Sequence, residues 1–594
     1  MSNLELGIIG NCSFGAMVND QGRIVWCCLP RFDGDPVFHS LLGSADGDAR
    51  TGAFTIEIDG LKESEQRYVE NTAVLKTVLH SASGSIEITD CAPRFYWRDR
   101  IFRPHTLVRR IAPISGNPRI RIRLRPQFDY GSLAPTITHG SNHIRYVGPN
   151  LTLRLTADAP IDFILNETLF NLEEPVNCIL GPDETLAEGV GDTARMFEER
   201  TVHYWQSWCR RLALPFEYQE AVIRAAITLK LCTYEQTGAI VAAMTTSIPE
   251  APDSGRNWDY RYCWLRDAFF VVRALNSLAA VKTMENYFRW LMNVVTCGDE
   301  EHLQPLFGVG LERVLTERTI TSLPGYRGMG PVRIGNQAFE HFQHDVYGNV
   351  ILGATQAFFD KRLFRIAGLD EFRRLEVLGE QAVRLYDQPD AGMWELRSRS
   401  RVHTSSSLMC WAACDRLADI AAHLGEADRA KYWHTSAAKI KAKILKEAWS
   451  DDRKAFVESF GGQHLDASVL LMAEVGFIDP TDPRFVSTVE QLDKLLGRGL
   501  HMMRYEAADD FGLPTTAFNI CSFWRLDALA RIGRKEEARE IFEAMLEIRT
   551  NLGLLPEDTN PENGELWGNF PQTYSMVGII NGAVRLSKPW ETVI

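Results

Sequence analysis

The stretch RIRIRLR at residues 119–125 has isoleucine or leucine at every second position and arginine between them. Side chains of a β-strand point alternately to the two faces of a sheet, so this pattern predicts a strand with one buried face. GAFTIEIDG at 52–60 alternates in the same way, and turn residues such as NDQG at 19–22 separate further apolar runs. Short strands at this spacing predict an antiparallel β-sandwich in the first third of the chain.

From about residue 190 onward the apolar residues follow the period of a helix instead. The segment 192–212 predicts one helix, and 405–449 predicts two helices that are separated at Gly425. In KEEAREIFEAMLEI at 535–548, the residues that form one apolar face are Ala538, Ile541, Phe542, Met545 and Ile548. We therefore expect a helical second domain whose long loops carry the functional residues.

Length and composition restrict the class of protein. The chain has 594 residues, 45% of them hydrophobic and 24% charged, which is typical of a globular protein with more than one domain. Its net charge of −13 and the lack of a basic stripe argue against a nucleic acid partner. We find neither a secretory signal nor a long apolar run, so we expect no membrane contact and a cytoplasmic location with reduced cysteines.

The segment NWDYRYCWLRDAFF at 257–270 mixes aromatic rings with charged side chains. A sugar matches this mixture, because its C–H faces pack on rings such as Trp264 while its hydroxyls need polar partners. Arg266 beside Asp267 offers a donor fork next to an acceptor pair, which suits neighbouring hydroxyls. The alternative is a buried ion pair beneath a core rich in rings, and these residues alone leave both interpretations open.

Two further stretches supply carboxyl groups. In AGMWELRSR at 391–399, Glu395 follows Trp394, and a ring that shields a carboxyl group from water favours the protonated form that a general acid needs. Glu557 lies in a loop before an expected helix at 571–584. The neighbouring carboxylates that could serve instead are Asp558, Glu562 and Glu565. Acidic residues before a helix are also ordinary caps, but two carboxylates beside an Arg–Asp pair fit glycoside hydrolysis.

Together these stretches resemble glycoside hydrolase family 15, which includes glucoamylase-like enzymes and bacterial trehalases. The resemblance extends over nearly the whole chain. In order, it is carried by GNCSFGAMVNDQGRIVWCCLPRFDGDPVF (10–38), NWDYRYCWLRDA (257–268), PVRIGNQAFEHFQHDVYGNV (331–350), WELRSRSRVHTSSSLMCWAACDR (394–416), CSFWRLDALARIGR (521–534) and GLLPEDTNPENGELWGNFPQTYS (553–575).

The resemblance implies an N-terminal antiparallel β-sandwich followed by an (α/α)6 barrel. We place the sandwich with a linker helix at its end in residues 1–200 and the catalytic barrel in 201–594. By position in the family motifs, Glu395 looks like the general acid and Glu557 like the general base of an inverting hydrolysis. The residues that the resemblance places around the substrate are Trp264, Arg266, Asp267, Trp394 and Arg504.

The resemblance implies an exo-acting hydrolase that releases β-D-glucose from the non-reducing end of a small α-glucoside. The expected location favours trehalose, and the alternatives are a glucoamylase or a hydrolase of isomaltose or malto-oligosaccharides. A disaccharide phosphorylase would need no base such as Glu557, and a non-catalytic carbohydrate-binding protein would need neither glutamate. We expect no cofactor and no metal, since Cys410 and Cys414 have no matching His or Cys cluster. A homo-oligomer is compatible with the sequence.

Overall fold

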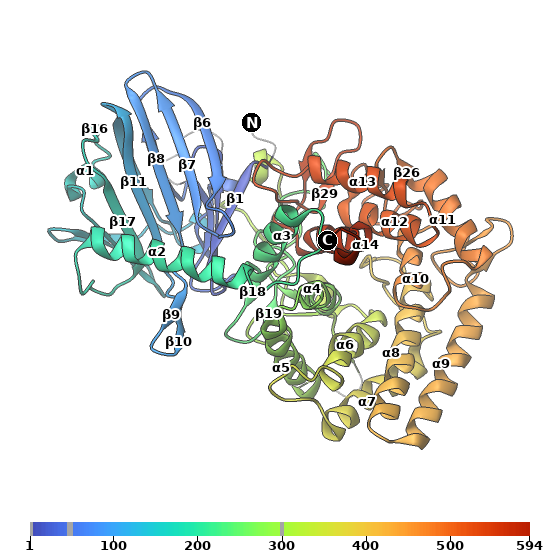
Figure 1. Ribbon diagram of the computed structural model, residues 1–594. Coiled ribbons are helices and arrows are strands. Elements are labelled where there is room, and N and C mark those ends of the chain that lie inside the picture. The colour runs from blue at the N-terminus through green and yellow to red at the C-terminus, as the bar shows by residue number, and fades with distance from the viewer. Residues whose placement is uncertain (1–3, 44–50, 298–301, 594) are drawn as a thin grey trace.

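The computed structural model of the chain describes residues 4–43, 51–297 and 302–593. Figure 1 shows two parts beside each other. The first, coloured blue to cyan, consists mainly of strands, and the second, coloured green to red, is a ring of helices. This order of strands followed by helices is the order that the sequence pattern predicts.

The described N-terminal part contains two large antiparallel sheets and a small one of two strands, β9 (Phe95–Trp97) and β10 (Arg100–Phe102). The strands of the first sheet are, in order, β1 (Leu6–Gly10), β2 (Gly15–Asn19), β3 (Ile24–Cys28), β5 (Ala53–Ile58), β12 (Arg119–Arg125) and β16 (Phe170–Asn171), with β4 (Pro36–Phe38) paired to β3. Those of the second sheet are, in order, β13 (Thr136–His139), β14 (His143–Val147), β15 (Thr152–Ala157), β17 (Val176–Pro182), β11 (Leu107–Gly116), β8 (Gly84–Cys91), β7 (Leu75–Ser81) and β6 (Leu61–Tyr68).

The alternating stretch at 119–125 forms strand β12 for the expected reason. It pairs with β5, and Ile120, Ile122 and Leu124 are buried, whereas the arginines between them are exposed or half-buried. The three residues share one apolar core with Ile86 and Ile111 of the second sheet, so the inner faces of the two sheets cover each other. The strands predicted from the alternation are confirmed.

Helix α2 (Val190–Cys209) joins the two parts. It packs along β17 and β11 of the second sheet, and in Figure 1 it runs below that sheet toward the helical ring. The helix predicted over 192–212 is therefore confirmed, with an earlier start and end. Because α2 passes through residue 200, the predicted division of the chain falls inside this helix and stays a prediction.

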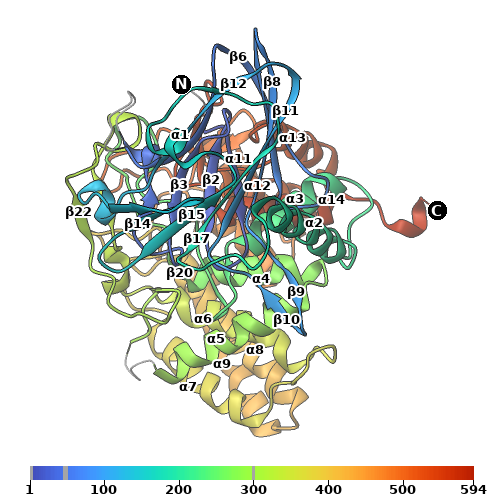
Figure 2. The same cartoon turned by 90° about the vertical axis from the view of Figure 1, so that its left-hand side faces the viewer.

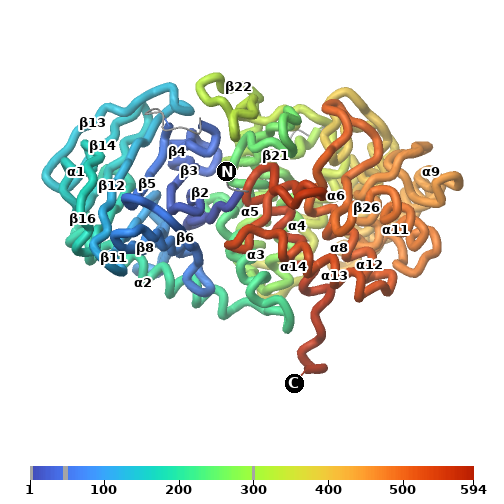
Figure 3. Tube along the Cα trace, turned by 90° about the horizontal axis from the view of Figure 1, so that it is seen from above, coloured from blue at the N-terminus to red at the C-terminus, as the bar shows by residue number. Residues whose placement is uncertain are grey.

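The second part is a double layer of helices, which Figure 3 shows from above beside the sandwich. These helices are α3 (Gln219–Leu231), α4 (Leu265–Ser277), α5 (Val281–Cys297), α6 (Asp345–Thr355), α7 (Leu369–Leu385), α8 (Thr404–His423), α9 (Ala427–Glu447), α10 (Leu471–Glu474), α11 (Pro483–Leu496), α12 (Asn519–Arg531), α13 (Lys535–Glu547) and α14 (Thr573–Leu586). Gly425, between α8 and α9, has a φ of 80°, a conformation that glycine adopts without strain.

The inner layer runs through α4, α6, α8, α10, α12 and α14, and it closes because α14 packs on α4. In α3, which also contacts β1, every residue of 225–231 is buried, whereas the other outer helices bury one face only. In α13, for example, Ala538, Ile541, Phe542 and Met545 are buried as predicted, and Ile548 lies half-buried just beyond the helix. This arrangement confirms the predicted sandwich and (α/α)6 barrel. In the described ranges, no helix has the length and apolar character that a membrane crossing requires.

Seen from the sandwich side in Figure 2, the sheets stand in front of the upper part of the barrel, and α7 and α9 project below them. The sandwich and barrel also share one large apolar core, which contains Trp26 of β3 together with residues of α3 and α4. The N-terminal part is therefore fastened to the barrel and does not hang from a flexible linker.

Candidate active site

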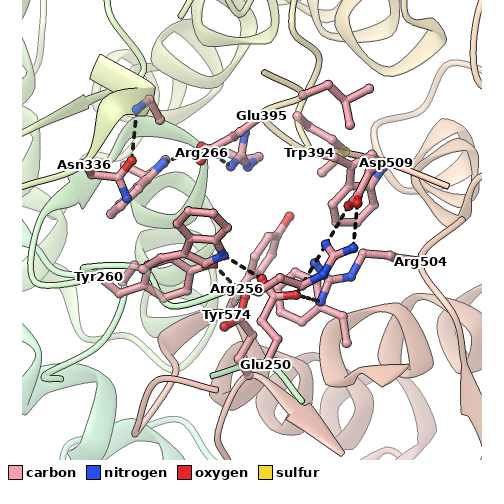
Figure 4. Close-up of a pocket in the computed structure, with 18 of the residues that line it drawn as sticks. Glu250, Arg256, Tyr260, Arg266, Asn336, Trp394, Glu395, Arg504, Asp509 and Tyr574 are labelled. Carbon is pink, nitrogen blue, oxygen red and sulfur yellow. Dashed lines mark hydrogen bonds and ion pairs between the residues drawn. The ribbon is translucent and has the colours of Figure 1, made fainter. Parts of the chain in front are cut away.

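A cavity with a volume of about 90 Å³ lies at the end of the barrel where α4, α12 and α14 begin. Trp264, Phe518 and Gln572, which directly precede these helices, line it. Figure 4 shows charged and aromatic side chains arranged around an open centre. Since one water molecule needs roughly 10–15 Å³ of such space, the cavity has room for a group as large as several waters.

All the site residues predicted from the sequence line this one cavity, although they come from distant parts of the chain. They are Trp264, Arg266, Asp267, Trp394, Glu395, Arg504 and Glu557. Within the described residues, no group of three or more His, Cys, Asp or Glu side chains is placed to hold a metal ion. Carboxyl, guanidinium and aromatic groups predominate in its lining, together with His341 and the amides of Asn336 and Gln572.

Three aromatic residues of the segment 257–264 each donate a hydrogen bond from the N–H or O–H group of the side chain to a carboxylate. The three hydrogen bonds run from Trp258 Nε1 to Glu250 (2.9 Å), from Tyr260 OH to Glu557 (2.6 Å) and from Trp264 Nε1 to Glu395 (2.6 Å). Buried Tyr and Trp usually find such partners for their polar atoms. The aromatic residues thus hold the carboxylates of the site in place. The sequence had predicted a different role for these rings, that of packing against the C–H faces of a sugar.

Two charged residues between these rings fasten the same segment to the sandwich. Asp259 and Arg261 form an ion pair at 2.7 Å in which neither side chain is exposed. Arg261 also donates to the Tyr130 hydroxyl at 2.8 Å and to the Gly34 carbonyl at 2.7 Å, both in the N-terminal part. Charge-assisted bonds of this kind are short and directional. The sandwich therefore holds in place the segment that supplies the ring donors.

We call the first group of charges at the cavity the Arg266 cluster; it consists of Arg266, Asp267 and Glu395, which line the cavity, and of the buried Asp345. The distances from Arg266 are 3.4 Å to Asp345, 3.5 Å to Glu395 and 3.7 Å to Asp267, each from a different nitrogen. Gln343 joins the cluster by accepting from Arg266 at 3.1 Å and donating to Glu395 at 3.3 Å. One guanidinium thus serves three carboxyl groups.

Glu395 is held in an unusual backbone conformation between α7 and α8. Its φ is 60°, in the left-handed region that residues other than glycine seldom adopt, which is a common feature of functional sites. Its side chain remains 23% exposed and faces the cavity. This side of the cavity is therefore partly open. Nearby, burial raises the pKa of Asp267 to about 6, while Arg266 lowers this pKa and Glu395 raises it.

The second group, the Arg504 cluster, consists of Arg504, Glu250, Glu557 and Asp558, all of them buried. A single nitrogen of Arg504, Nη2, lies 2.9 Å from Glu250 and 3.0 Å from Asp558. Glu557 accepts from Tyr260 through Oε1, and its Oε2 has no hydrogen-bond partner among the described residues. That buried oxygen therefore keeps its capacity to accept a hydrogen bond.

Burial raises the pKa of Glu557 well above the ordinary value of a glutamate. Glu250 and Asp558 raise it further, whereas Arg504 and the hydrogen bond from Tyr260 lower it. A raised pKa makes an ionised carboxylate a stronger proton acceptor. A strongly perturbed carboxyl group in a cavity is also typical of functional sites.

Trp394 lies beside Glu395 in the chain, but its ring has a different contact from the one that the sequence predicted. Its Nε1 donates to the buried Asp466 at 2.7 Å, and its ring packs at 6.2 Å from Trp524. The ring whose edge touches Glu395 is that of Trp264. Trp394 still lines the cavity, where it forms part of the wall.

The structure also separates Glu557 from the acidic residues that follow it. Asp558 is fully buried and bound to Arg504, Glu562 is exposed, and Glu565 pairs with Arg327 at 2.7 Å. None of these three lines the cavity. Of the four carboxylates that the sequence left open, Glu557 is the one that reaches it.

Comparison with known proteins agrees with this geometry. Residues 217–584 match the profile of glycosyl hydrolases family 15, and residues 4–168 match the profile described as trehalase-like, N-terminal. The chain belongs to glycosyl hydrolase family 15. It is a glycoside hydrolase, and the resemblance seen in its sequence motifs is confirmed.

Several relatives match over almost the full length. The chain is 32% identical to a protein named trehalase from Mycobacterium tuberculosis, over 97% of this chain and 88% of the relative. It is 30% identical to trehalase 1 of Sulfolobus acidocaldarius, over 96% of each. A crystal structure of a bacterial glucoamylase complexed with acarbose superposes with a TM-score of 0.72 at 13% identity, covering 98% of this chain and 93% of that one. At that identity the glucoamylase shows a shared fold alone.

Sequence reasoning missed some charged or polar residues of the site, namely Glu250, Gln343 and Asp345. Glu250 lies in TTSIPEAPDSG at 245–255, a segment without apolar period or charge pattern. Its hydrogen-bond donor, Trp258, is close in the chain, but its ionic partner Arg504 comes from a distant loop. No sequence signal joins residues so far apart, so only the fold reveals the contact.

Proposed function

We propose that the chain hydrolyses trehalose with inversion of configuration, with Glu395 as general acid and Glu557 as general base. The observation that carries the proposal is the pairing of these two glutamates at one cavity, each bound by a ring donor from the same segment. The substrate is supported by relatives named trehalase that match 96–99% of this chain. An inverting hydrolase needs such a pair of carboxyl groups with room for a water between them.

In this mechanism Glu395 donates its proton to the oxygen that joins the two glucose rings, and the bond from that oxygen to one anomeric carbon breaks. Glu557 takes a proton from a water molecule as the oxygen of that water bonds to the same carbon. Attack from the opposite face converts that glucose to the β form, and the other ring leaves as α-glucose. The unpartnered Oε2 of Glu557 supports its role as the acceptor.

Arg266 and Asp267 are proposed to hold the hydroxyls of the non-reducing glucose, beside the ring of Trp264. Both charged residues lie in the first turn of α4 and line the cavity, where their side chains are only 12% and 9% exposed. Hydrogen bonds from sugar hydroxyls to charged groups are stronger than those between neutral groups. Arg504 and Trp394 are proposed to complete the wall on the other side.

Proton NMR of a fresh digest tests the stereochemistry. Hydrolysis of trehalose with inversion yields α- and β-glucose in equal initial amounts, whereas retention yields only the α form before mutarotation. Initial rates on trehalose, maltose, isomaltose, maltotriose and soluble starch then rank the substrates. A higher rate on maltotriose or starch than on trehalose would replace the trehalose proposal by a glucoamylase-type activity. Release of glucose 1-phosphate when phosphate is added would indicate a phosphorylase.

A further inference from the structure

Glu250 is a buried carboxylate of the cavity to which the proposed mechanism gives no role. Its side chain is 4% exposed; one oxygen accepts a hydrogen bond, and the other is close to a cation without hydrogen-bond geometry. Oε1 accepts from Trp258 at 2.9 Å, and Oε2 lies 2.9 Å from Nη2 of Arg504. Figure 4 shows Glu250 on the opposite side of the open centre from Glu395. A burial this complete places its charge where little water screens it.

The surroundings of Glu557 hold more negative than positive charge. Glu250 and Asp558 share the guanidinium of Arg504, and within the described part of the chain Tyr260 is the only hydrogen-bond donor to the side chain of Glu557. The next cation, Arg256, lies 3.9 Å from Glu250 but is bound through two nitrogens to Asp509, at 2.5 and 2.6 Å. Three buried carboxyl groups therefore compete for one available guanidinium.

We propose that Glu250 is a positioning residue of the hydrolysis: it competes with Glu557 for the field of Arg504 and thereby sets the pH at which the base becomes ionised. The proposal rests on the proposed function, because it takes Glu557 to be the base. Like charges in a site of low dielectric constant cannot all be ionised at small cost. A proton is therefore retained within the Arg504 cluster at pH values where exposed carboxyl groups have lost theirs.

The direction of the effect follows from the groups that face Glu557. Burial raises the pKa of Glu557, with Glu250 and then Asp558 as the next causes, and Arg504 and Tyr260 oppose them. Removal of the Glu250 charge eliminates one repulsion and also releases Arg504 to interact more strongly with the remaining carboxylates. Both changes favour the ionised form of Glu557, so the base should become active at a lower pH.

A purely structural role for Glu250 predicts something else. Loss of a buried, hydrogen-bonded carboxylate would lower the melting temperature and the rate at every pH, without moving the profile. Glu376 offers a matched control, because it is also buried, accepts from the indole of Trp433 at 2.8 Å and pairs with Arg373 at 2.8 Å. It lies in the outer helix α7 and does not line the cavity.

The test is the pH dependence of kcat/KM for the best substrate of the panel, measured on the full chain. In Glu250→Gln we expect the acidic limb to move to lower pH by about one unit. In Glu376→Gln we expect a lower melting temperature and an unmoved limb. An acidic limb that stays in place in a folded Glu250→Gln protein would overturn the proposal, and so would a shift to higher pH.

Glu250→Asp keeps the negative charge but moves it away from the base, because the side chain is shorter by one methylene group. The acidic limb of kcat/KM for this variant should therefore lie between those of the parent and Glu250→Gln. If Glu250→Gln does not fold, this smaller shift toward lower pH still tests the proposal, and no shift rejects it. Glu557→Gln is assayed in the same series. Full activity in that variant would reject the base assignment itself, whereas an inactive Glu557→Gln with an unmoved limb in Glu250→Gln rejects only the role of Glu250.

Discussion

The Arg266 cluster and the Arg504 cluster contain the same kinds of charged group, and Figure 4 shows Arg266 and Glu395 across the open centre of the cavity from Arg504 and Glu250. Each contains one arginine and three carboxyl groups, and each receives one hydrogen bond from a ring of the segment 257–264 to its proposed catalytic glutamate. They differ in access to solvent. The side chain of Glu395 is 23% exposed, whereas Glu557 is 1% exposed.

The arginines also distribute their contacts differently. Arg266 uses a separate nitrogen for each of its three carboxylates, whereas Arg504 uses one nitrogen for both Glu250 and Asp558. The contacts of Arg504 are shorter than those of Arg266, yet burial raises the pKa of Asp558 to about 7, with Arg504 lowering it and Glu250 raising it. Two sites with one arginine and three carboxyl groups each therefore differ in proton affinity through burial and through the repulsion between neighbouring carboxylates.

The largest expected effect comes from removing either glutamate. Glu395→Gln and Glu557→Gln should each lower kcat by ~10²–10⁴-fold, since each loses a general acid or base. The two variants should differ on α-glucosyl fluoride, whose leaving group departs without protonation. We expect Glu395→Gln to recover most of its lost rate on this substrate and Glu557→Gln to recover little, as measured by fluoride release.

Glu562→Gln serves as the control for both variants, because Glu562 is exposed in the same loop and does not line the cavity. It should keep the parent rate on every substrate. If the fluoride restored Glu557→Gln and not Glu395→Gln, the roles of the two clusters would be exchanged. If Glu557→Gln kept the parent kcat, another group would be the base.

The next effect is on binding in the Arg266 cluster. Arg266→Ala and Asp267→Ala should each lower kcat/KM by roughly 10–100-fold with a raised KM, because a hydrogen bond from a hydroxyl to a charged group contributes about 1.5–3 kcal/mol. Asp90→Ala is the control, since Asp90 and Arg109 form a fully buried ion pair within the sandwich. Asp90→Ala should lower the melting temperature and leave kcat and KM unchanged. Unchanged kinetics with a lower melting temperature in Asp267→Ala would make the Arg266–Asp267 pair structural as well.

Much of the fold was predictable because its signals are local. The alternation in β12 and the helical period in α13 each lie within one element, and both describe which side of that element is buried. The Arg266–Asp267 pair was recognisable for the same reason, since both residues lie in one helical turn. Family motifs added the two glutamates, which neither period nor composition could have connected.

The hydrogen-bond pattern of the site was not predictable, because it depends on loops that meet only in the folded chain. Trp394 illustrates this: its place before Glu395 suggested a ring against that carboxyl group, but the indole binds Asp466 instead. The side-chain direction depends on the φ of 60° at Glu395, which the sequence does not reveal. Glu250 was missed because its partner Arg504 belongs to a different loop.

The third effect distinguishes the two arginines by pH. Arg504→Gln removes the cation that lowers the pKa of Glu557, so the acidic limb of kcat/KM should move to higher pH by about one unit. Arg266→Gln should reduce the rate without moving this limb. The measurement is kcat/KM against pH for both variants, with circular dichroism as a check of folding. Equal shifts in the two variants would show that the clusters titrate as one unit.

The smallest effect concerns Trp394, which precedes Glu395 in the chain and whose ring lies 6.0 Å from the guanidinium of Arg504. Trp394→Phe keeps a ring there but removes the N–H that binds Asp466 at 2.7 Å. The acidic limb of kcat/KM should therefore stay in place, since neither cluster loses a charge. A shifted limb would mean that the indole couples the two sides of the cavity.

The stability of Trp394→Phe should depend on pH, with a sign set by Asp466. Burial raises the pKa of Asp466 to about 6, so the stability contributed by its neutral form is complete below its unfolded pKa of about 3.9 and is lost as pH rises through about 6. Loss of the N–H disfavours the charged form further. Denaturant unfolding should show a loss about 1 kcal/mol larger at pH 7.5 than at pH 4, because hydrogen bonds to charged groups are the stronger ones. Trp205→Phe, whose buried Nε1 has no partner among the described residues, should lose the same stability at both pH values.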